Sequence, residues 1–434
     1  MKRDKKGRFT SEADDNKGYK FTLTFPSVKN LIFWVFILIL VSPWAIILER
    51  SNILQKLLEF LENMANIGLV TFSQTLDNYG QVLQALATQK YLQGRGHDVF
   101  LLRRDAEFSE VAKHQLKRFV ATLLLKLHIL NNKEEVLKKL AGERKRQQKA
   151  LYSEKEHPRN FEEFRQQNFK IIHADNSNLK KHNINVLCTG SDQIWSGKNT
   201  FFFLRFAGHS FKRIAIAPST GNRANVACKE SKITKWLHDY SFITTREDSG
   251  VKFCKINGYS NVRKILDPTF LMDKQGYDVI ASSEFHTNEY IFVYLLNSCN
   301  VITYSDISAF AKSHELEIIY VTGQGLYDKN KKVYASIPEW LSLLRDASYV
   351  ITNSFHGMAM SIVYKKKFLV LPLTGMNSKT NERVTNVLGE MGLDRRVYSN
   401  NLDQLLEEID YGVAEKKIKE NRRILDDLML SVEL

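Results

Sequence analysis

The amino-acid sequence predicts an α/β protein with two domains, each built on a parallel β-sheet. Short apolar runs typical of strands alternate with segments whose apolar residues recur at helical spacing, and this alternation implies parallel strands joined by right-handed crossovers. A polar stretch at residues 281–289 interrupts the series, which begins again at Tyr290. The chain has 434 residues, which is long for one hydrophobic core. We therefore place one domain at residues 64–285 and the other at 286–434.

Residues 1–63 precede the first domain and have a different character. A basic tail leads into the apolar segment Leu31–Leu48, which as a helix would be about 27 Å long and only marginally able to cross a membrane core of roughly 30 Å. Pro43 interrupts this segment, and a leucine-rich amphipathic stripe follows up to Leu61. We expect an interfacial or re-entrant helix that contacts the membrane through residues 31–61. The alternative is that Met64 is the true start of the protein.

The first domain opens with a buried strand at Ile67–Phe72, a polar loop, and a helix that includes Gln81–Ala87. A helical, basic insertion is expected at about 107–170, where lysine and arginine alternate with glutamate; we interpret it as a solvated surface. The further strands of this domain are predicted at Asp98–Leu102, Asn185–Cys188, Arg213–Ala217, Phe242–Thr245 and Val262–Leu266.

The second domain repeats the alternation of strands and helices and ends in a series of helices. Its strands are predicted at Tyr290–Leu296, Glu317–Val321, Tyr349–Thr352 and Phe368–Leu371. Helices are predicted at Ile307–His314, Pro338–Arg345, from Met358 onward, and at Glu382–Met391, Leu402–Ile409 and Glu415–Leu430. We expect one of the terminal helices to pack back across the first domain.

The charge of the chain favours an anionic partner. The formal net charge is +14 and the isoelectric point is near 9.3, which suits phosphate esters, anionic lipid or nucleic acid. Nucleic acid is the weakest of these, because the sequence has no zinc-finger spacing and no RNA-binding signature. The cysteines, of which Cys188 lies within an apolar run, are widely separated, so neither a metal site nor a disulfide framework is predicted. A reducing, cytoplasmic setting fits this pattern.

His356 lies where a buried strand passes into a helix. Val350 and Ile351 end an apolar run, and helical spacing begins after Gly357. The free N–H groups and the dipole of a helix N-terminus favour a bound anion, and Gly357 would let that anion approach the backbone. Ser354 belongs to the same junction. The sequence therefore predicts an anionic substrate handled by an acid-base imidazole.

Further polar residues follow other predicted strands, at the sheet edge where α/β proteins bind ligands. Arg246 follows a buried strand and would bind a carboxylate or phosphate, or else pair with Glu247 or Asp248 beside it. Asp77 would accept a proton from a substrate hydroxyl, or else cap the following helix. The remaining candidate substrate-binding residues are Asn78, Ser191, Asp192, Gln193 and Arg383.

The sequence resembles the polysaccharide pyruvyl transferase family from about Ile67 to about Arg396. The most diagnostic runs are Gly190-Ser191-Asp192-Gln193-Ile194-Trp195 and Ser354-Phe355-His356-Gly357. The other matching runs are Asp77 to Ala85, Ala217-Pro218-Ser219, Thr245-Arg246-Glu247, Leu266-Asp267-Pro268-Thr269 and Asn381-Glu382-Arg383.

The resemblance implies two Rossmann-like domains in a GT-B-like arrangement, with phosphoenolpyruvate as donor and a sugar as acceptor. It implies no cofactor and no metal. The apolar segment and the basic insertion favour a lipid-linked oligosaccharide as that acceptor. His356 and Asp77 would be catalytic, with His356 as general acid or phosphate anchor, and Arg246 would bind the donor. The product would be a pyruvate ketal on a cell-surface polysaccharide, made at the cytoplasmic face of the inner membrane, or in the cytoplasm if translation starts at Met64.

Two other functions remain open from the sequence. A GT-B glycosyltransferase that uses a nucleotide sugar in envelope polysaccharide synthesis would place its diphosphate in the same anion site. A catalytically silent, membrane-associated assembly factor would bind no donor at all.

Overall fold

The computed structural model describes residues 2–3, 9–10, 64–104, 155–221, 229–284, 288–296, 301–323, 330–373 and 381–434. The chain divides into two compact units, Met1–Glu62 and Asn63–Leu434. In the first, β1 (Lys2–Arg3) pairs antiparallel with β2 (Phe9–Thr10). The predicted membrane segment at 31–61 and most of the basic insertion at 107–170 lie outside the described residues. Within the described ranges, no helix is both long and apolar enough to cross a bilayer.

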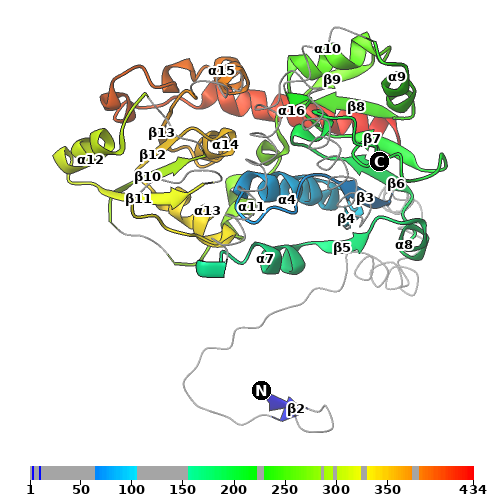
Figure 1. The fold of residues 1–434 in the computed structure, drawn as a ribbon, viewed down its shortest axis with the longest axis horizontal. Helices are drawn as coiled ribbons and strands as arrows, with labels where there is room; N and C mark the ends of the chain where they lie inside the picture. Colours follow the sequence, from blue (N-terminus) through cyan, green and yellow to red (C-terminus); the bar gives the residue numbers. More distant parts are fainter. Residues whose placement is uncertain are drawn as a thin grey trace, which may run out of the picture. The chain divides into compact units, whose positions relative to one another are not determined.

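The first sheet of the second unit has seven parallel strands among the described residues, in the order β5-β4-β3-β6-β7-β8-β9 (Figure 1). The chain starts in the middle with β3, adds β4 and β5 on one side, and then crosses to β6 on the other. This reversal makes the carboxyl ends of β3 and β6 the expected ligand-binding position. The strands are β3 (Asn66–Val70), β4 (Asp98–Arg103), β5 (Lys170–His173), β6 (Val186–Thr189), β7 (Lys212–Ala215), β8 (Phe242–Thr245) and β9 (Val262–Lys264).

The strand β5 is absent from the sequence prediction, which assigned residues 107–170 to a helical insertion. Helix α7 (Phe161–Asn168) agrees with that prediction, but a strand follows at once and pairs with β4. Only Ile171 and Ile172 in β5 are apolar, and neither is fully buried, because β5 is the edge strand of the sheet. Two apolar residues between polar ones are too short a pattern to identify a strand.

Helix α4 (Tyr79–Gly94) lies between the two sheets of the second unit (Figure 1). Most of its residues are buried, which is expected of a helix with protein on all sides. The loop before it is held by Arg165 of α7, whose Nη1 donates to the carbonyl oxygens of Ser73 at 3.0 Å and Thr75 at 2.6 Å. The other helices of this domain are α8 (Asn176–Lys181), α9 (Ser231–His238), α10 (Asp248–Ile256) and α11 (Lys274–Asp278).

The second sheet is also parallel, with the order β11-β10-β12-β13. Its reversal lies between β10 and β12, so a ligand is expected at their carboxyl ends. The strands are β10 (Tyr290–Leu295), β11 (Glu317–Thr322), β12 (Tyr349–Thr352) and β13 (Lys367–Val370). The helices are α12 (Tyr304–Ser313), α13 (Ile337–Asp346), α14 (Phe355–Val363) and α15 (Asn381–Glu390). These positions agree with the sequence prediction to within a few residues.

The prediction of a helix at Leu402–Ile409 is wrong. Only a short 3₁₀ turn, Leu402–Leu405, forms there. Glu407 and Glu408, which would have continued the helix, instead pair with Arg396 and Lys367. These ion pairs hold the segment against the end of the second sheet.

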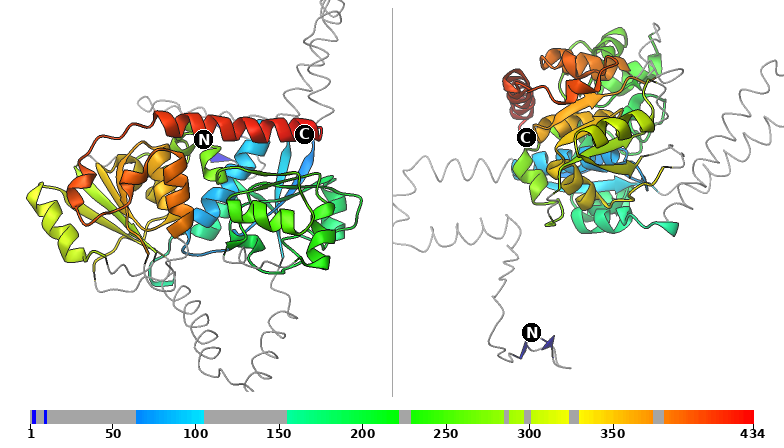
Figure 2. Two further views of the ribbon diagram at one scale, coloured as in Figure 1. Left: turned by 90° about the horizontal axis from the view of Figure 1, so that it is seen from above. Right: turned by 90° about the vertical axis from the view of Figure 1, so that its left-hand side faces the viewer.

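The terminal helix α16 (Gly412–Ser431) packs across the first domain, as the sequence led us to expect (Figure 2). Asn421 Oδ1 accepts from the buried backbone N–H of Leu266 at 2.9 Å. Asp426 accepts from Tyr91 Oη at 2.7 Å and pairs with Arg95 at 2.9 Å, both at the end of α4. Glu415 of α16 pairs with Lys365 of the second domain, so the last helix of the chain contacts both domains.

A cluster of aromatic rings joins the two sheets from inside. Tyr79, in the first turn of α4, stacks on Trp340 of α13 with ring centroids 5.2 Å apart and contacts Tyr294 of β10. Tyr79 Oη donates to the carbonyl oxygen of Ala335 at 2.6 Å. One continuous hydrophobic core includes residues of both sheets, so the position of α4 is fixed relative to both.

We predict that Tyr79→Phe destabilises the fold. The substitution leaves the buried carbonyl of Ala335 without this donor, which costs about 1–3 kcal/mol. Urea unfolding should give a lower midpoint with an unchanged slope. An unchanged midpoint would mean that this hydrogen bond does not hold the two sheets together.

Candidate functional site

A cavity of about 280 Å³ lies where the carboxyl ends of the two sheets face each other. The first sheet contributes residues that follow β3, β6 and β8, and the second contributes residues that follow β10, β12 and β13. Both reversal points in strand order therefore open onto one cavity, as expected for an α/β ligand site. Its lining is Phe72, Asn78, Gln81, Asp192, Gln193, Arg246, Leu296, Asn353, Ser354, Phe355, His356, Leu373, Arg383 and Val384.

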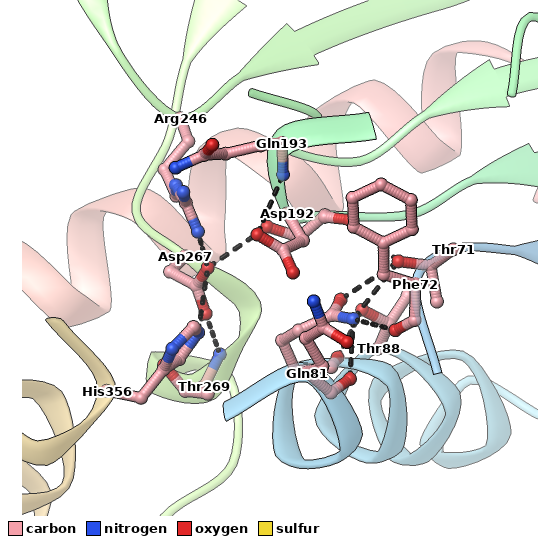
Figure 3. Close-up of polar contacts among 12 residues, drawn as sticks. Thr71, Phe72, Gln81, Thr88, Asp192, Gln193, Arg246, Asp267, Thr269 and His356 are labelled. Atoms are coloured by element: carbon pink, nitrogen blue, oxygen red, sulfur yellow. Dashed lines mark hydrogen bonds and ion pairs between the residues drawn. The ribbon is translucent and has the colours of Figure 1, made fainter. Parts of the chain in front are cut away.

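A buried ion pair forms one wall of the cavity. Arg246 Nη1 lies 2.6 Å from Asp267 Oδ2, and the side chains are 2% and 0% exposed (Figure 3). Burial alone would raise the pKa of Asp267, but the charges of Arg246 and His356 outweigh it and, with hydrogen bonds from Thr269 and Arg246, lower the pKa to about 2. Ser191 Oγ donates to the same carboxylate at 3.0 Å. Removing Arg246 would leave a buried unpaired charge, which costs about 3–5 kcal/mol.

Arg246 also pairs with a neighbouring acid. Its Nε lies 3.0 Å from Glu247 Oε1, whereas Asp248 pairs with Lys264 instead. Its guanidinium carbon lies 4.9 Å from the ring centroid of Phe355, which belongs to the other domain. The predicted pairing with an adjacent acid is therefore confirmed for Glu247, whereas binding of a carboxylate or phosphate ligand stays a prediction for a side chain that lines the cavity.

His356 belongs to the second domain, and its side chain contacts residues of the first domain. Its Nε2 lies 3.8 Å from Asp267 Oδ2. The other side of the ring packs on the first turn of α4 so closely that a Cβ at Gly80 would lie 2.0 Å from Nδ1. Burial is the largest influence on the pKa of His356 and lowers it below its ordinary 6.5; Asp267 opposes this effect and Arg246 adds to it. Burial of the ring therefore favours the neutral form of the imidazole.

The N-terminus of α14 borders the cavity. Ser354 is the N-cap, and its hydroxyl accepts from the N–H of Gly357 at 3.3 Å. Phe355 and His356 begin the helix, where backbone N–H groups have no partner within the helix. A Cβ at Gly357 would lie 2.4 Å from Thr352 Oγ1, so the glycine permits close packing of α14 on β12. The approach of an anion to its backbone stays a prediction.

Arg383, in helix α15, lines the cavity on the side of the second domain. With the amide oxygen of Gln193 turned towards it, Gln193 accepts from Nη1 at 2.7 Å and from Nη2 at 3.0 Å. Among the described residues no carboxylate lies within ion-pair distance of Arg383, unlike Arg246. Burial lowers the pKa of Arg383, and the nearby charge of Arg246 lowers it further. Arg383 is therefore a cation held by a neutral partner.

The cavity brings together most of the predicted site residues. Arg246, His356, Asn78, Asp192, Gln193, Ser354 and Arg383 line it. Ser191 and Gly357 are not part of the lining. Ser191 donates a hydrogen bond to Asp267, and Gly357 packs against Thr352. Asp77 is outside the lining; its Oδ1 accepts from Thr75 Oγ1 at 3.2 Å, and the N-cap of α4 is Asn78 rather than Asp77.

Sequence reasoning assigned no role to Asp267, which holds Arg246 in place. A carboxylate directly after the last strand of the sheet was the available signal, because the carboxyl ends of parallel strands share one edge. Asn353 directly follows β12 and carries the same kind of signal, whereas Phe72, Gln81 and Val384 have none. In the described part of the chain, no cluster of three or more His, Cys, Asp or Glu side chains is placed to hold a metal ion.

Solved structures with a similar chain path include nucleotide-sugar enzymes. The UDP-GlcNAc 2-epimerase from Neisseria meningitidis bound to UDP-GlcNAc is 9% identical, with 85% of this chain and 100% of that chain covered and a TM-score of 0.41. The UDP-GlcNAc 2-epimerase from Methanocaldococcus jannaschii (10% identity, 85% and 99% covered, TM-score 0.40) and the glycotransferase of kitacinnamycin (12%, 84% and 96%, TM-score 0.35) are also similar. With these TM-scores, none carries an argument about function. A comparison with curated proteins gives no match.

Two facing parallel α/β sheets with a polar cavity at both strand-order reversals define a class of ligand-binding α/β proteins that includes many transferases. The model of the polysaccharide pyruvyl transferase family matches residues 78–373, which is more than half of the chain. The chain belongs to this family, and it is a transferase.

We predict that Gly80→Ala displaces the imidazole of His356. The added methyl group would lie 2.0 Å from Nδ1, so the ring has to move. Gly94→Ala, at the other end of the same helix, is the matched control, because a Cβ there meets nothing within 4 Å. The imidazole resonances of His356 in ¹H–¹⁵N spectra should change in the first variant alone. Equal spectra for the two variants would contradict the packing of His356 on α4.

Proposed function

We propose that the protein transfers the enolpyruvyl group of phosphoenolpyruvate to a sugar of a cell-surface polysaccharide or its precursor, forming a pyruvate ketal, without a cofactor. The family supplies the reaction class. The observation that carries the proposal is that His356, Arg246 and Arg383 line a single small cavity. An acid-base group and two guanidinium groups in one cavity suit a donor that bears both a phosphate and a carboxylate.

The charges suggest how the donor would lie. Arg246 is already matched by Asp267 and Glu247, so it adds little net attraction. Arg383 has only the neutral Gln193, and the N-terminus of α14 offers backbone N–H groups. The phosphate would therefore sit between Arg383 and α14. At about 280 Å³ the cavity lies just below the usual range of roughly 300–1,000 Å³ for ligand sites, which favours a three-carbon donor over a nucleotide sugar.

The reaction needs one proton at carbon and a base for two hydroxyl groups. A proton adds to the methylene carbon of the donor, which becomes a methyl group, and the first sugar hydroxyl bonds to the neighbouring carbon as it loses its own proton. The carbon–oxygen bond to phosphate then breaks, phosphate leaves with the electron pair, and the second hydroxyl takes its place and loses its proton. The products are the ketal and inorganic phosphate.

His356 would supply the proton to carbon. Burial lowers the pKa of its imidazole and so favours the neutral form in the free protein. A dianionic phosphate in the cavity would add negative charge beside the ring and so raise that pKa. Binding of the donor would thus turn His356 into an acid only when the donor is in place.

We also propose that the reaction takes place at the cytoplasmic face of the inner membrane, with contact through residues 31–61 and a sugar or lipid-linked oligosaccharide as acceptor. The hydropathy of Leu31–Leu48 supports this proposal, and start of translation at Met64 would make the protein cytoplasmic instead. Fractionation of cells with tagged full-length and Met64-start chains is the direct test. Equal partition of the two chains would contradict membrane contact.

We predict that Arg383→Gln weakens the binding of phosphoenolpyruvate about tenfold or more and leaves the fold intact. The substitution removes a charge-assisted contact, and such contacts typically contribute about 1.5–3 kcal/mol. Arg395→Gln is the matched control, because it makes the same charge change at an exposed position. Calorimetric titration with phosphoenolpyruvate measures both. If neither the donor nor a nucleotide sugar binds the unaltered protein, the assembly-factor function gains support; a nucleotide sugar bound in place of the donor would indicate a glycosyltransferase.

We predict a pH profile that His356 controls. If the imidazolium is the acid, kcat/KM should fall as pH rises through the pKa of the free protein, which lies below 6.5. The fall in kcat should occur at higher pH, because the bound donor raises that pKa. His356→Gln should reduce turnover about 10²–10⁴-fold and abolish the separation between the two profiles. An unchanged separation in the variant would assign the titration to another group.

A further inference from the structure

Asp192 adopts a backbone conformation that is essentially confined to glycine. Its φ is 77° and its ψ is 177°, whereas residues with a Cβ avoid this region for steric reasons. The residue lies in the loop that follows β6, at the strand-order reversal of the first sheet. Strain of this kind persists only where the surroundings enforce it, and it concentrates at functional sites.

The surroundings do enforce it. The carbonyl oxygen of Asp192 accepts from the N–H groups of Ile194 and Ser219, both at 2.8 Å. Asp192 also forms a parallel bridge with Pro218, beyond the end of β7. The loop after β6 and the loop after β7 thus clamp the residue from both sides. Its side chain consequently borders the cavity, between Arg246 on one side and Phe72 on the other (Figure 3).

Asp192 is also the carboxylate best placed to accept a proton there. Asp267 is fully buried and accepts hydrogen bonds from Arg246, Ser191 and Thr269. Glu247 pairs with Arg246, and neither it nor Asp77 lines the cavity. Asp192 Oδ1 accepts from the N–H of Gln193 at 2.7 Å, and within the described residues no hydrogen bond occupies Oδ2.

We propose that Asp192 is the general base that deprotonates the acceptor sugar, a role expected of Asp77 from the sequence. This inference rests on the proposed function. As the first hydroxyl oxygen bonds to the central carbon of the donor, its proton passes to Asp192 Oδ2, while His356 gives a proton to the methylene carbon. Asp192 returns its proton to solvent, and the second hydroxyl transfers its proton in the same way as phosphate departs.

The first test separates strain from function. Asp192→Ala and Asp192→Gly both lack the carboxylate, but only glycine relieves the backbone strain. Thermal unfolding should give a higher Tm for Asp192→Gly than for Asp192→Ala, with both variants inactive. The opposite order of Tm would show that the backbone at this position is not strained and would remove the basis of the inference.

The second test measures catalysis with the full chain. Glycan extracted from cells that lack the protein serves as acceptor, and phosphate release from phosphoenolpyruvate is measured. Asp192→Asn should lower turnover about 10²–10⁴-fold while calorimetry shows donor binding unchanged. Asp427→Asn, an exposed site on α16, is the control for the same chemical change. Sodium formate should partly restore Asp192→Gly, because a small carboxylate can occupy the vacated space, and sodium chloride at equal ionic strength should not.

The outcomes separate this inference from the function on which it rests. If the unaltered protein releases no phosphate from the donor with this glycan, the proposed function fails. If the unaltered protein is active, the inference is overturned by turnover of Asp192→Asn within threefold of normal, by an Asp192→Gly deficit that formate leaves unchanged, or by loss of turnover in Asp77→Asn instead.

Discussion

The buried ion pair between Arg246 and Asp267 is the constraint on which the site depends. Both side chains are almost fully inaccessible, so each charge is stable only while the other is present. Through Ser191, the pair connects the ends of β6, β8 and β9. Phe355 and His356 of the second domain rest against it, at 4.9 Å from Arg246 and 3.8 Å from Asp267. Loss of either charge of the Arg246–Asp267 pair would therefore disturb both the first sheet and the position of the His356 imidazole.

This arrangement differs from a simple cationic pocket. Arg246 and Arg383 are opposed by Asp192, Glu247 and Asp267, and burial lowers the pKa of His356, which favours the neutral imidazole. Long-range attraction of an anion therefore has to come from the surplus of basic residues over the whole chain. Among the described residues, no carboxylate forms a direct ion pair with Arg383, although the charges of Asp192, Glu247 and Asp267 lie near it.

Much of the fold could be predicted from the sequence, because fully buried parallel strands such as Val186–Thr189 are mostly apolar and are followed by polar site residues. Local patterns failed where the structure depends on contacts between distant segments. The edge strand β5 has only two apolar residues. The helix expected at Leu402–Ile409 does not form, because Glu407 and Glu408 pair with Arg396 and Lys367 instead. Gly80 is glycine because His356, 276 positions later, occupies the space of its Cβ. No periodicity in the sequence can reveal such a pair.

Asp192 is a case in which the local rule and the fold disagree, and the disagreement is informative. The turn after β6 requires, at position 192, a backbone conformation that glycine adopts freely, and the residue there is aspartate. A sequence selected for stability alone would place glycine at 192. The strain costs about 1–3 kcal/mol, and the side chain offsets it only by capping the 3₁₀ turn Gln193–Trp195 through one hydrogen bond from Gln193 N–H. The carboxylate therefore has to contribute something other than stability. Asp192 and His356 line the same cavity, so in the proposed reaction a proton acceptor and a proton donor would both face the substrates.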